Sequence, residues 1–250
     1  MNKLLKSAGL CLCLGGLLSL WGAFVFVAEA APVEFGTNAS GQKYGVELFS
    51  ETDLDLIAAV GTDGVQGYVR AEDLEESNPT SPAAALAESS KDAFLVPLYA
   101  DDGETVLGSF EVAPMRQSLK DVVGVTPYGT SYSSYKTFTV SGVSYQNRAS
   151  TATYSNLGSV QARVYVGRIS GSVPAGHLGY RCRLYNDSGV LLRASNYAYN
   201  NQTSVGVEGY TEYPANSGAF YSSGFTKVWN SSTSSYSGEF STYRSPSQSF

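Results

Sequence analysis

The sequence has 250 residues, with 16 Lys and Arg against 22 Asp and Glu, so its net charge is −6. This acidic balance argues against a nucleic-acid partner, which would require a basic surface. One histidine and three cysteines are too few for a His/Cys metal cluster, and a Ser-His-Asp triad would depend on that single histidine. The sequence also lacks the G-x-S-x-G pattern of a nucleophile elbow.

The first 30 residues have the pattern of a secretory signal peptide. Lys3 and Lys6 precede an apolar run from about residue 10 to residue 27, and the segment ends in Ala-Glu-Ala. This order of basic, apolar and small residues predicts cleavage after Ala30, leaving a secreted chain that starts at Ala31. The style of the leader suggests a Gram-positive bacterial host. If the leader stays uncleaved, its apolar run is long enough to anchor the protein in a membrane.

The leader also removes two of the three cysteines. Cys11 and Cys13 lie inside the apolar run, so Cys182 is alone in the mature chain. No intramolecular disulfide can then form, and the mature fold must rest on its apolar core. A lone thiol in an oxidising compartment is either buried or paired between chains, and we expect Cys182 to be buried because free cysteines usually are.

Charge divides the mature chain near Gly124. Residues 31–124 carry 5 Lys and Arg against 17 Asp and Glu, whereas residues 125–250 carry 9 against 4 and hold 15 of the 18 tyrosines. We interpret this as two domains of ordinary size, an acidic one followed by a Tyr/Ser-rich one.

Residues 31–124 predict a small mixed α+β domain. A first hairpin turns at Asp63-Gly64 and is closed by a single turn at residues 71–74. A helix follows, with Ser81 as its N-cap and Pro82 at its first position. A second hairpin occupies residues 94–112, around the turn "ADDGE".

Residues 125–250 alternate between apolar and polar side chains with a period of two. Seven strand candidates lie between residues 135 and 245, separated by Gly, Ser, Asn or Pro clusters, which predicts an antiparallel β-sandwich of about seven strands. The chain is therefore expected to be mainly β. Val160, Ala162, Val164 and Val166 mark an inner face, and we expect serine, threonine and tyrosine to form a solvated outer face.

The segment "HLGYRCRLYNDSG", residues 177–189, holds the single histidine and Cys182. In an extended strand, residues five apart lie on opposite faces, so His177 and Cys182 predict neither a catalytic pair nor a shared metal site. Cys182 shares its face with leucines and should be unreactive. Arg181, Arg183 and Tyr185 point the other way, which makes them candidate binding residues.

Two further candidate binding residues are Arg163 and Trp229. Arg163 could join Arg181 or Arg183 and other cations, namely Arg168, Arg193, Lys227 and Arg244, in a basic face that suits anionic wall polymers, lipid headgroups or an acidic protein. These cations could equally be scattered solubilising charges, or could face the acidic first domain. Trp229 and the tyrosines would suit a glycan platform, although tyrosine is also common on outer sheet faces.

Carboxylates of the acidic half offer a route to hydrolysis. Asp53, Asp55, Asp101, Asp102 and Glu104 crowd together in the sequence. The simpler interpretation is that "ADDGE" is a hairpin turn, because Asp and Gly are good turn formers. The spacing does not match a calcium loop, and no glycine pattern supports nucleotide binding, so we expect neither a metal nor a cofactor.

Two segments resemble modules of uncharacterised exported proteins of Gram-positive bacteria. "VPLYADDGETVLGSFEV", with the upstream "DLIAAVGTDGVQGYVRAEDL", is similar to one such module. "PAGHLGYRCRLYNDSGVLLRASNYAYN", with "GAFYSSGFTKVWN" and "STYRSPSQSF", resembles a second, from which it departs at Cys182. The resemblance covers about 150 residues and implies secretion and modularity, but no catalytic or binding residues.

The sequence thus favours a secreted, non-catalytic protein whose β-sandwich binds a cell-wall polymer, a glycan or a protein partner. A first alternative is an antimicrobial or signalling factor whose basic sandwich is masked by the acidic half. A second is a hydrolase that uses carboxylates of the first domain.

Overall fold

The structure is a computed structural model that describes residues 35–47, 53–76, 78–89, 91–117, 127–215 and 217–250. The predicted leader and the predicted boundary near Gly124 lie outside these described residues. Residues Pro32–Phe250 form one compact unit. In the described ranges, every helix is too short or too polar to cross a membrane.

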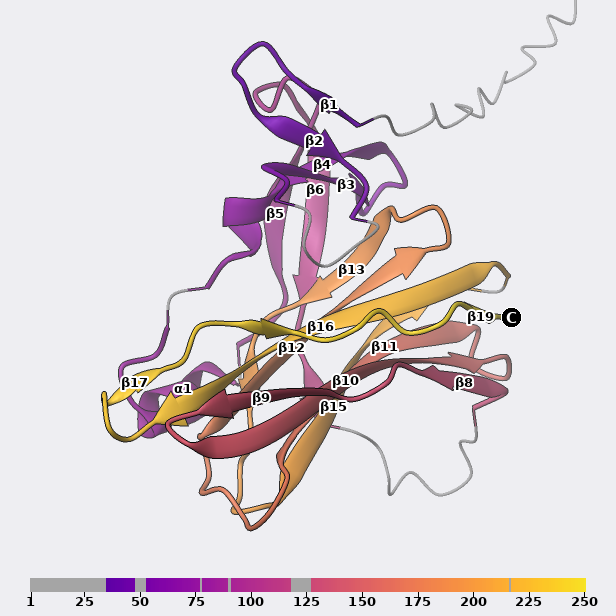
Figure 1. The fold of residues 1–250 in the computed structure, drawn as a ribbon. Coiled ribbons are helices and arrows are strands. Elements are labelled where there is room, and N and C mark those ends of the chain that lie inside the picture. The colour runs from indigo at the N-terminus through magenta and orange to yellow at the C-terminus, as the bar shows by residue number, and fades with distance from the viewer. Residues whose placement is uncertain (1–34, 48–52, 77, 90, 118–126, 216) are drawn as a thin grey trace, which may run out of the picture. The chain divides into compact units, whose positions relative to one another are not determined.

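The described chain is mainly β and is built from two sheets (Figure 1). The strands of sheet A are β1 (Gly36–Thr37), β2 (Lys43–Gly45), β3 (Leu56–Val60), β4 (Gln66–Arg70), β5 (Phe94–Tyr99), β6 (Val106–Ala113), β12 (Leu178–Asn186), β13 (Leu191–Ser195), β14 (Ala198–Tyr199), β16 (Ala219–Asn230), β17 (Ser235–Tyr236), β18 (Phe240–Ser241) and β19 (Gln248–Ser249). The strands of sheet B are β7 (Arg116–Gln117), β8 (Gly129–Tyr132), β9 (Lys136–Val140), β10 (Val143–Tyr154), β11 (Ser159–Arg168) and β15 (Gly206–Pro214).

The elements expected in the first half are present, and local chemistry explains each one. Strands β3 and β4 form a hairpin whose turn places Gly64 at a φ of 84°, in the left-handed region that favours glycine. A 3-10 turn follows at Ala71–Leu74. Helix α1 spans Pro82–Glu88, and the Ser81 side chain caps it by accepting a hydrogen bond from the backbone of Ala84. Strands β5 and β6 form the second hairpin.

The second half contains more strands than expected. The run from residue 135 to residue 154, read from the sequence as one strand, forms the two strands β9 and β10. They turn at Ser141-Gly142, where both residues have positive φ. The short strands β8 and β19 were not expected, because strands of two to four residues are too short to show a periodicity.

Sheet A is mixed rather than antiparallel. Strand β13 of the second half pairs in parallel with β6, at Ala194 and Val112, and with β3, at Leu191 and Ala59. An antiparallel sandwich of about seven strands behind a separate small α+β domain is therefore not confirmed, since strands from both halves share one sheet. The short hairpins of the first half bury their apolar faces by extending the sheet of the second.

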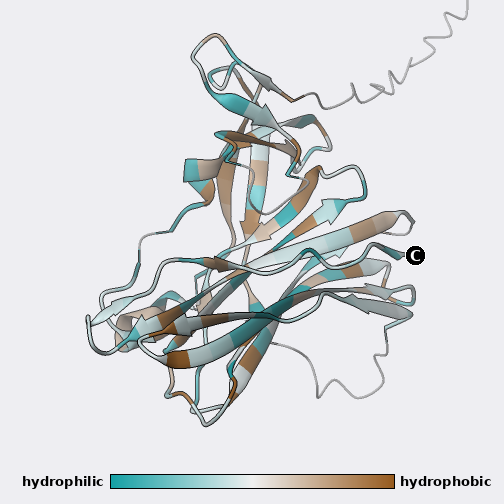
Figure 2. Cartoon of the chain, viewed as in Figure 1, coloured by the Kyte–Doolittle hydropathy of each residue, from teal (hydrophilic) through white to brown (hydrophobic). Residues whose placement is uncertain are grey.

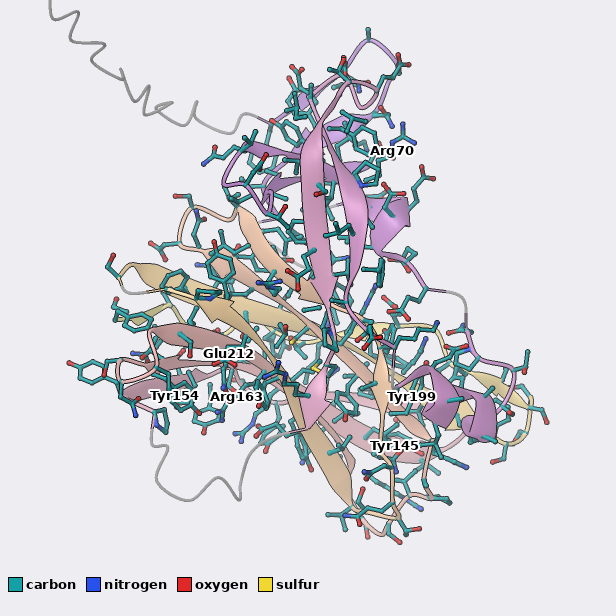
Figure 3. All side chains as sticks on the ribbon, turned by 180° about the vertical axis from the view of Figure 1, so that it is seen from behind. Arg70, Tyr145, Tyr154, Arg163, Tyr199 and Glu212 are labelled. Atoms are coloured by element: carbon teal, nitrogen blue, oxygen red, sulfur yellow. The ribbon has the colours of Figure 1, made fainter. Side chains whose placement is uncertain are left out.

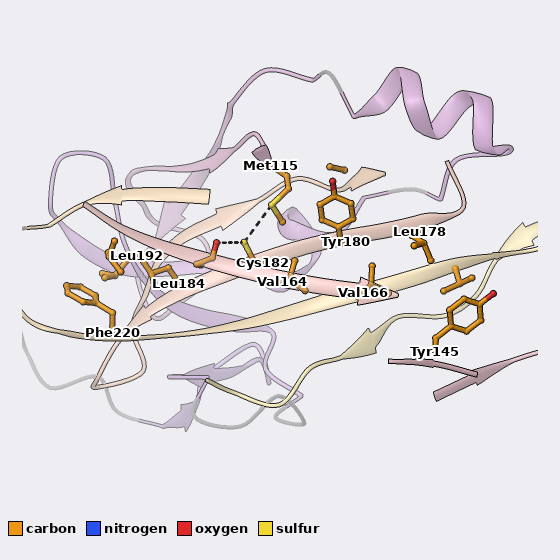
Figure 4. Close-up of a cluster of buried hydrophobic side chains, with 14 of the residues drawn as sticks. Met115, Tyr145, Val164, Val166, Leu178, Tyr180, Cys182, Leu184, Leu192 and Phe220 are labelled. Carbon is orange, nitrogen blue, oxygen red and sulfur yellow. Dashed lines mark hydrogen bonds between the residues drawn. The ribbon is translucent and has the colours of Figure 1, made fainter. Parts of the chain in front are cut away.

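The main core lies between sheet B and the part of sheet A formed by β12, β13 and β16. Apolar and polar bands both occur along these strands (Figure 2). The predicted inner face of β11 is confirmed, because Val160, Ala162, Val164 and Val166 are fully buried there. Side chains of β12 meet them from the opposite sheet (Figure 4).

Most tyrosines of the second half are buried, and among the described residues only Tyr128, Tyr132, Tyr135 and Tyr243 are exposed as the sequence suggested. Six of the largest fully buried side chains are tyrosines, namely Tyr180, Tyr185, Tyr197, Tyr199, Tyr210 and Tyr221. Tyr180 lies in the main core with Cys182, whereas Tyr185 of β12 and Tyr221 of β16 lie on the opposite face of sheet A, where Glu47 of the first half covers them. A second polar-aromatic layer thus lies behind the apolar core.

Candidate functional site

Three of the predicted binding residues are buried. Arg181, Arg183 and Tyr185 are 2%, 4% and 1% exposed, so the prediction that they present a surface to a partner is wrong. The prediction that these three side chains point away from Cys182 is correct, because they lie on the opposite face of β12. That face is covered by residues of both halves instead of solvent.

Arg183 and Tyr185 converge on Glu47. The Glu47 carboxylate accepts hydrogen bonds from the Arg183 guanidinium at 2.8 Å and from the Tyr185 hydroxyl at 2.5 Å. The Tyr221 ring stacks on Tyr185, and its hydroxyl donates to the backbone carbonyl of Glu47 at 2.9 Å. The buried cation is therefore neutralised by a carboxylate from the first half.

Arg181 is neutralised in the same way by two carboxylates. Its Nη2 lies 3.1 Å from Glu75 and 3.0 Å from Glu239. Its Nη1 donates to the backbone carbonyl of Leu74. Arg193, on β13, pairs with Glu111 of β6 at 2.7 Å. For Arg181, Arg183 and Arg193, the alternative that these cations face acidic residues of the first half is thus confirmed.

Arg163 and Trp229 make their contacts with other residues. Arg163 is on β11, on the face of sheet B opposite the core valines, and its guanidinium contacts Gln161 and Tyr154 (Figure 3). Trp229 is near the end of β16, where its ring packs against His177 and Tyr236. The five predicted binding residues are therefore not brought together into one site.

Cys182 lies in the main core, as predicted. Its Sγ is 3.2 Å from the carbonyl oxygen of Ala162 and 3.9 Å from the sulfur of Met115 (Figure 4). Burial raises the pKa of the thiol to about 12, which keeps it protonated and unreactive. His177 precedes β12, and burial lowers the pKa of its imidazole.

Two of the crowded carboxylates of the first half accept hydrogen bonds from backbone N–H groups. Asp102 accepts hydrogen bonds from the backbone of Glu104 and from the backbone and hydroxyl of Thr105, which lower the pKa of its carboxyl. Asp55 accepts one from the backbone of Lys43 at 2.7 Å. Within the described ranges, the structure contains no group of three or more His, Cys, Asp or Glu residues that could hold a metal ion.

The structure instead reveals a cleft that sequence reasoning missed. Strand β15 packs over β12 and β13, but its outer edge pairs only with the two-residue strand β7, at Gly209 and Tyr210, among the described residues. Sheet A continues past this edge through β6 and β5. Two adjoining pockets of about 380 and 430 Å³ lie where sheet A extends past the edge of sheet B. Both pockets are lined by Glu111, Arg193 and Pro214.

The Glu111–Arg193 pair stands at the centre of this inter-sheet cleft. The first pocket is also lined by Arg116 and Glu212, whose charged groups lie 3.7 Å apart. The second pocket adds Asp63 and Tyr213, and the guanidinium carbon of Arg193 lies 5.6 Å from the centre of the Tyr213 ring. The cleft therefore combines planar charged groups, an aromatic ring and nearly balanced charge.

Two buried polar atoms of the cleft lack a hydrogen bond to any described residue. They are the hydroxyl of Thr211, a residue that is 2% exposed, and Nε of Arg193. Buried polar groups in proteins are almost always hydrogen-bonded, so these two atoms are exceptions in the wall of the cleft. No sequence signal marked Thr211 or Glu111, because neither is part of a motif.

Comparison of the chain with protein-family models, with curated proteins and with solved structures gave no match.

Proposed function

We propose that the protein is an exported, non-catalytic binding protein whose inter-sheet cleft binds a neutral glycan of the cell envelope. The observation that supports this proposal is the Glu111–Arg193 pair, which lines both pockets.

The chemistry of the cleft favours a polyhydroxylated ligand. A sugar hydroxyl both donates and accepts hydrogen bonds, so it can accept from the Arg193 guanidinium and donate to the Glu111 carboxylate. Charge-assisted hydrogen bonds of this kind are among the stronger ones. The Tyr213 ring offers an apolar surface at the wall of the second pocket.

Charge balance selects a neutral glycan over an anionic wall polymer. Three carboxylates, of Asp63, Glu111 and Glu212, line the cleft against the two guanidinium groups of Arg116 and Arg193. A phosphate-rich polymer would meet excess negative charge there. The arginines of β12 give it no alternative surface, because they are buried and paired.

The test is a glycan array probed with the full mature chain, followed by calorimetric titration of the tightest neutral oligosaccharide. We expect Glu111→Gln to weaken binding at least tenfold, because it removes the carboxylate that accepts the sugar hydroxyl. Thr211→Val, which deletes only the hydroxyl, should weaken it less.

The matched control is Glu208→Gln, which makes the same change on β15, on the face of sheet B that points away from the core. The affinity of the Glu208→Gln variant for the oligosaccharide should equal that of the unmodified chain. No binding to any neutral glycan, or equal losses in Glu111→Gln and Glu208→Gln, would overturn the proposal.

A further inference from the structure

Lys227 is a buried lysine surrounded by aromatic rings. It lies on β16 and is 1% exposed, and its Nζ is 3.7 Å from the centre of the Tyr197 ring. The rings of Tyr199 and Tyr236 follow at 5.6 and 5.7 Å. Such a site withdraws the amine from water, which disfavours its charged form.

The amine lacks an ion-pair partner among the described residues. Eight ion pairs are found in those ranges, and Lys227 belongs to none of them. Burial lowers the pKa of Lys227 to about 8. A substantial fraction of neutral amine is therefore present near neutral pH, and a desolvated neutral lysine is a good nucleophile.

The group that meets this amine is the side-chain amide of Asn78. Lys227 Nζ lies 2.9 Å from Asn78 Oδ1, so the amide carbon bonded to that oxygen is within reach of the nitrogen lone pair. Asn78 is otherwise exposed, which gives a leaving group a route to solvent. The next residue is Pro79, and its backbone nitrogen carries no hydrogen, so the usual cyclisation of asparagine onto the following amide is blocked.

Glu76 supplies a carboxyl group to the same place. One of its oxygens accepts a hydrogen bond from the backbone of Tyr197 at 2.7 Å, which holds it beside the ring that covers Lys227. Burial raises the pKa of Glu76, and its charge interacts with that of Lys227. A carboxyl whose pKa is raised by burial holds a proton more readily than an exposed one, which suits it to general acid–base catalysis.

We propose that Lys227 and Asn78 are joined by an intramolecular isopeptide bond, which forms within the folded chain with Glu76 transferring the protons. Nζ attacks the amide carbon of Asn78, the new C–N bond forms, and the bond from that carbon to Nδ2 breaks. One proton leaves Nζ through Glu76 and reaches Nδ2, which departs as ammonia. Nothing is oxidised or reduced, so no further reactant is required.

The bond would connect the two halves of the chain. It joins residues 149 positions apart, one beside α1 and the other on β16. In the described ranges the free cysteine is Cys182, buried in the core, so no disulfide there performs this role. A covalent link across so long a loop restricts the unfolded chain and stabilises the fold.

Intact mass spectrometry of the purified mature protein tests the proposal without any variant. We expect a mass lower than the sequence mass by one ammonia molecule, and a tryptic digest should contain a branched peptide that joins Asn78 to Lys227. The full sequence mass, together with separate unmodified peptides, would overturn the proposal.

Variants then test the role of each group, with circular dichroism to confirm that each still folds. Lys227→Arg and Asn78→Ala should have the full mass expected for their sequences. Glu76→Gln should fold but keep its ammonia and yield no branched peptide. Complete cross-linking in Glu76→Gln would overturn the role of Glu76. Loss of ammonia in Lys227→Arg would show that the mass deficit has another origin and would overturn the bond itself.

Discussion

The carboxylate of Glu47 lies 2.8 Å from the guanidinium of Arg183, and both side chains are more than nine-tenths buried. The two residues are 136 positions apart and come from the two halves of opposite charge. The charge division of the sequence is thus expressed as buried ion pairs within one folded unit.

Removing this carboxylate should destabilise the protein strongly. Glu47→Gln leaves the Arg183 cation buried without a counter-charge, which costs about 3–5 kcal/mol when a buried pair is broken. Urea unfolding followed by circular dichroism measures the change in the free energy of unfolding. Glu72→Gln is the matched control, because Glu72 pairs with Arg70 on the surface, where ion pairs contribute about 0–1 kcal/mol. Equal losses of unfolding free energy in the two variants would contradict the view that buried ion pairs hold the two halves together.

The second half should not fold by itself. A fragment of residues 127–250 lacks Glu47 and Glu75, so Arg183 loses its carboxylate partner and Arg181 keeps only Glu239. Strand β13 also loses both of its parallel neighbours. We expect poorly dispersed amide NMR signals and binding of a hydrophobic dye. Addition of a separate 31–117 fragment should restore dispersion. A well-dispersed spectrum of residues 127–250 alone would show that the halves are independent.

The thiol of Cys182 should be inert in the native protein. It is fully buried, and its raised pKa keeps it protonated at pH 8. We expect no reaction with a disulfide reagent under native conditions and complete reaction in denaturant. Prompt reaction of the native chain, or a dimer on a non-reducing gel, would mean that the thiol is accessible.

His177 should make stability depend on pH. Burial lowers its folded-state pKa, so the unfolded chain binds more protons as pH falls through 6.5, its ordinary value. The stabilisation is therefore present above pH 6.5 and is lost as pH falls through the folded-state pKa. The difference in the free energy of unfolding between the wild type and His177→Gln should shrink from pH 8 to pH 5. A difference that stays constant would exclude His177 as the source.

Features that depend only on residues adjacent in the sequence were predicted correctly. Asp63-Gly64 specifies a turn by its own backbone preference, and Ser81-Pro82 begins a helix without help from the rest of the chain. The period of two along β12 correctly placed Cys182 and Arg183 on opposite faces. Each of these features is determined by a few consecutive residues, so a short stretch of sequence is enough to predict it.

The pairing of distant segments could not be predicted in this way. Whether Arg183 meets solvent or Glu47 depends on a covering segment 136 positions away. Glu111 and Arg193 meet because β6 and β13 are parallel neighbours, a pairing that alternation along either strand does not encode. The cleft exists because sheet A extends past the edge of sheet B, which is a property of the assembled sheets.

The most direct test of the proposed function is a crystal structure of the mature chain with the tightest neutral oligosaccharide from the array. We expect a sugar ring in the inter-sheet cleft, with a hydroxyl hydrogen-bonded to both Glu111 and Arg193 and the ring near Tyr213. A sugar bound instead over the exposed rings of Tyr132 and Tyr135 on sheet B, with the cleft empty, would contradict the proposed site.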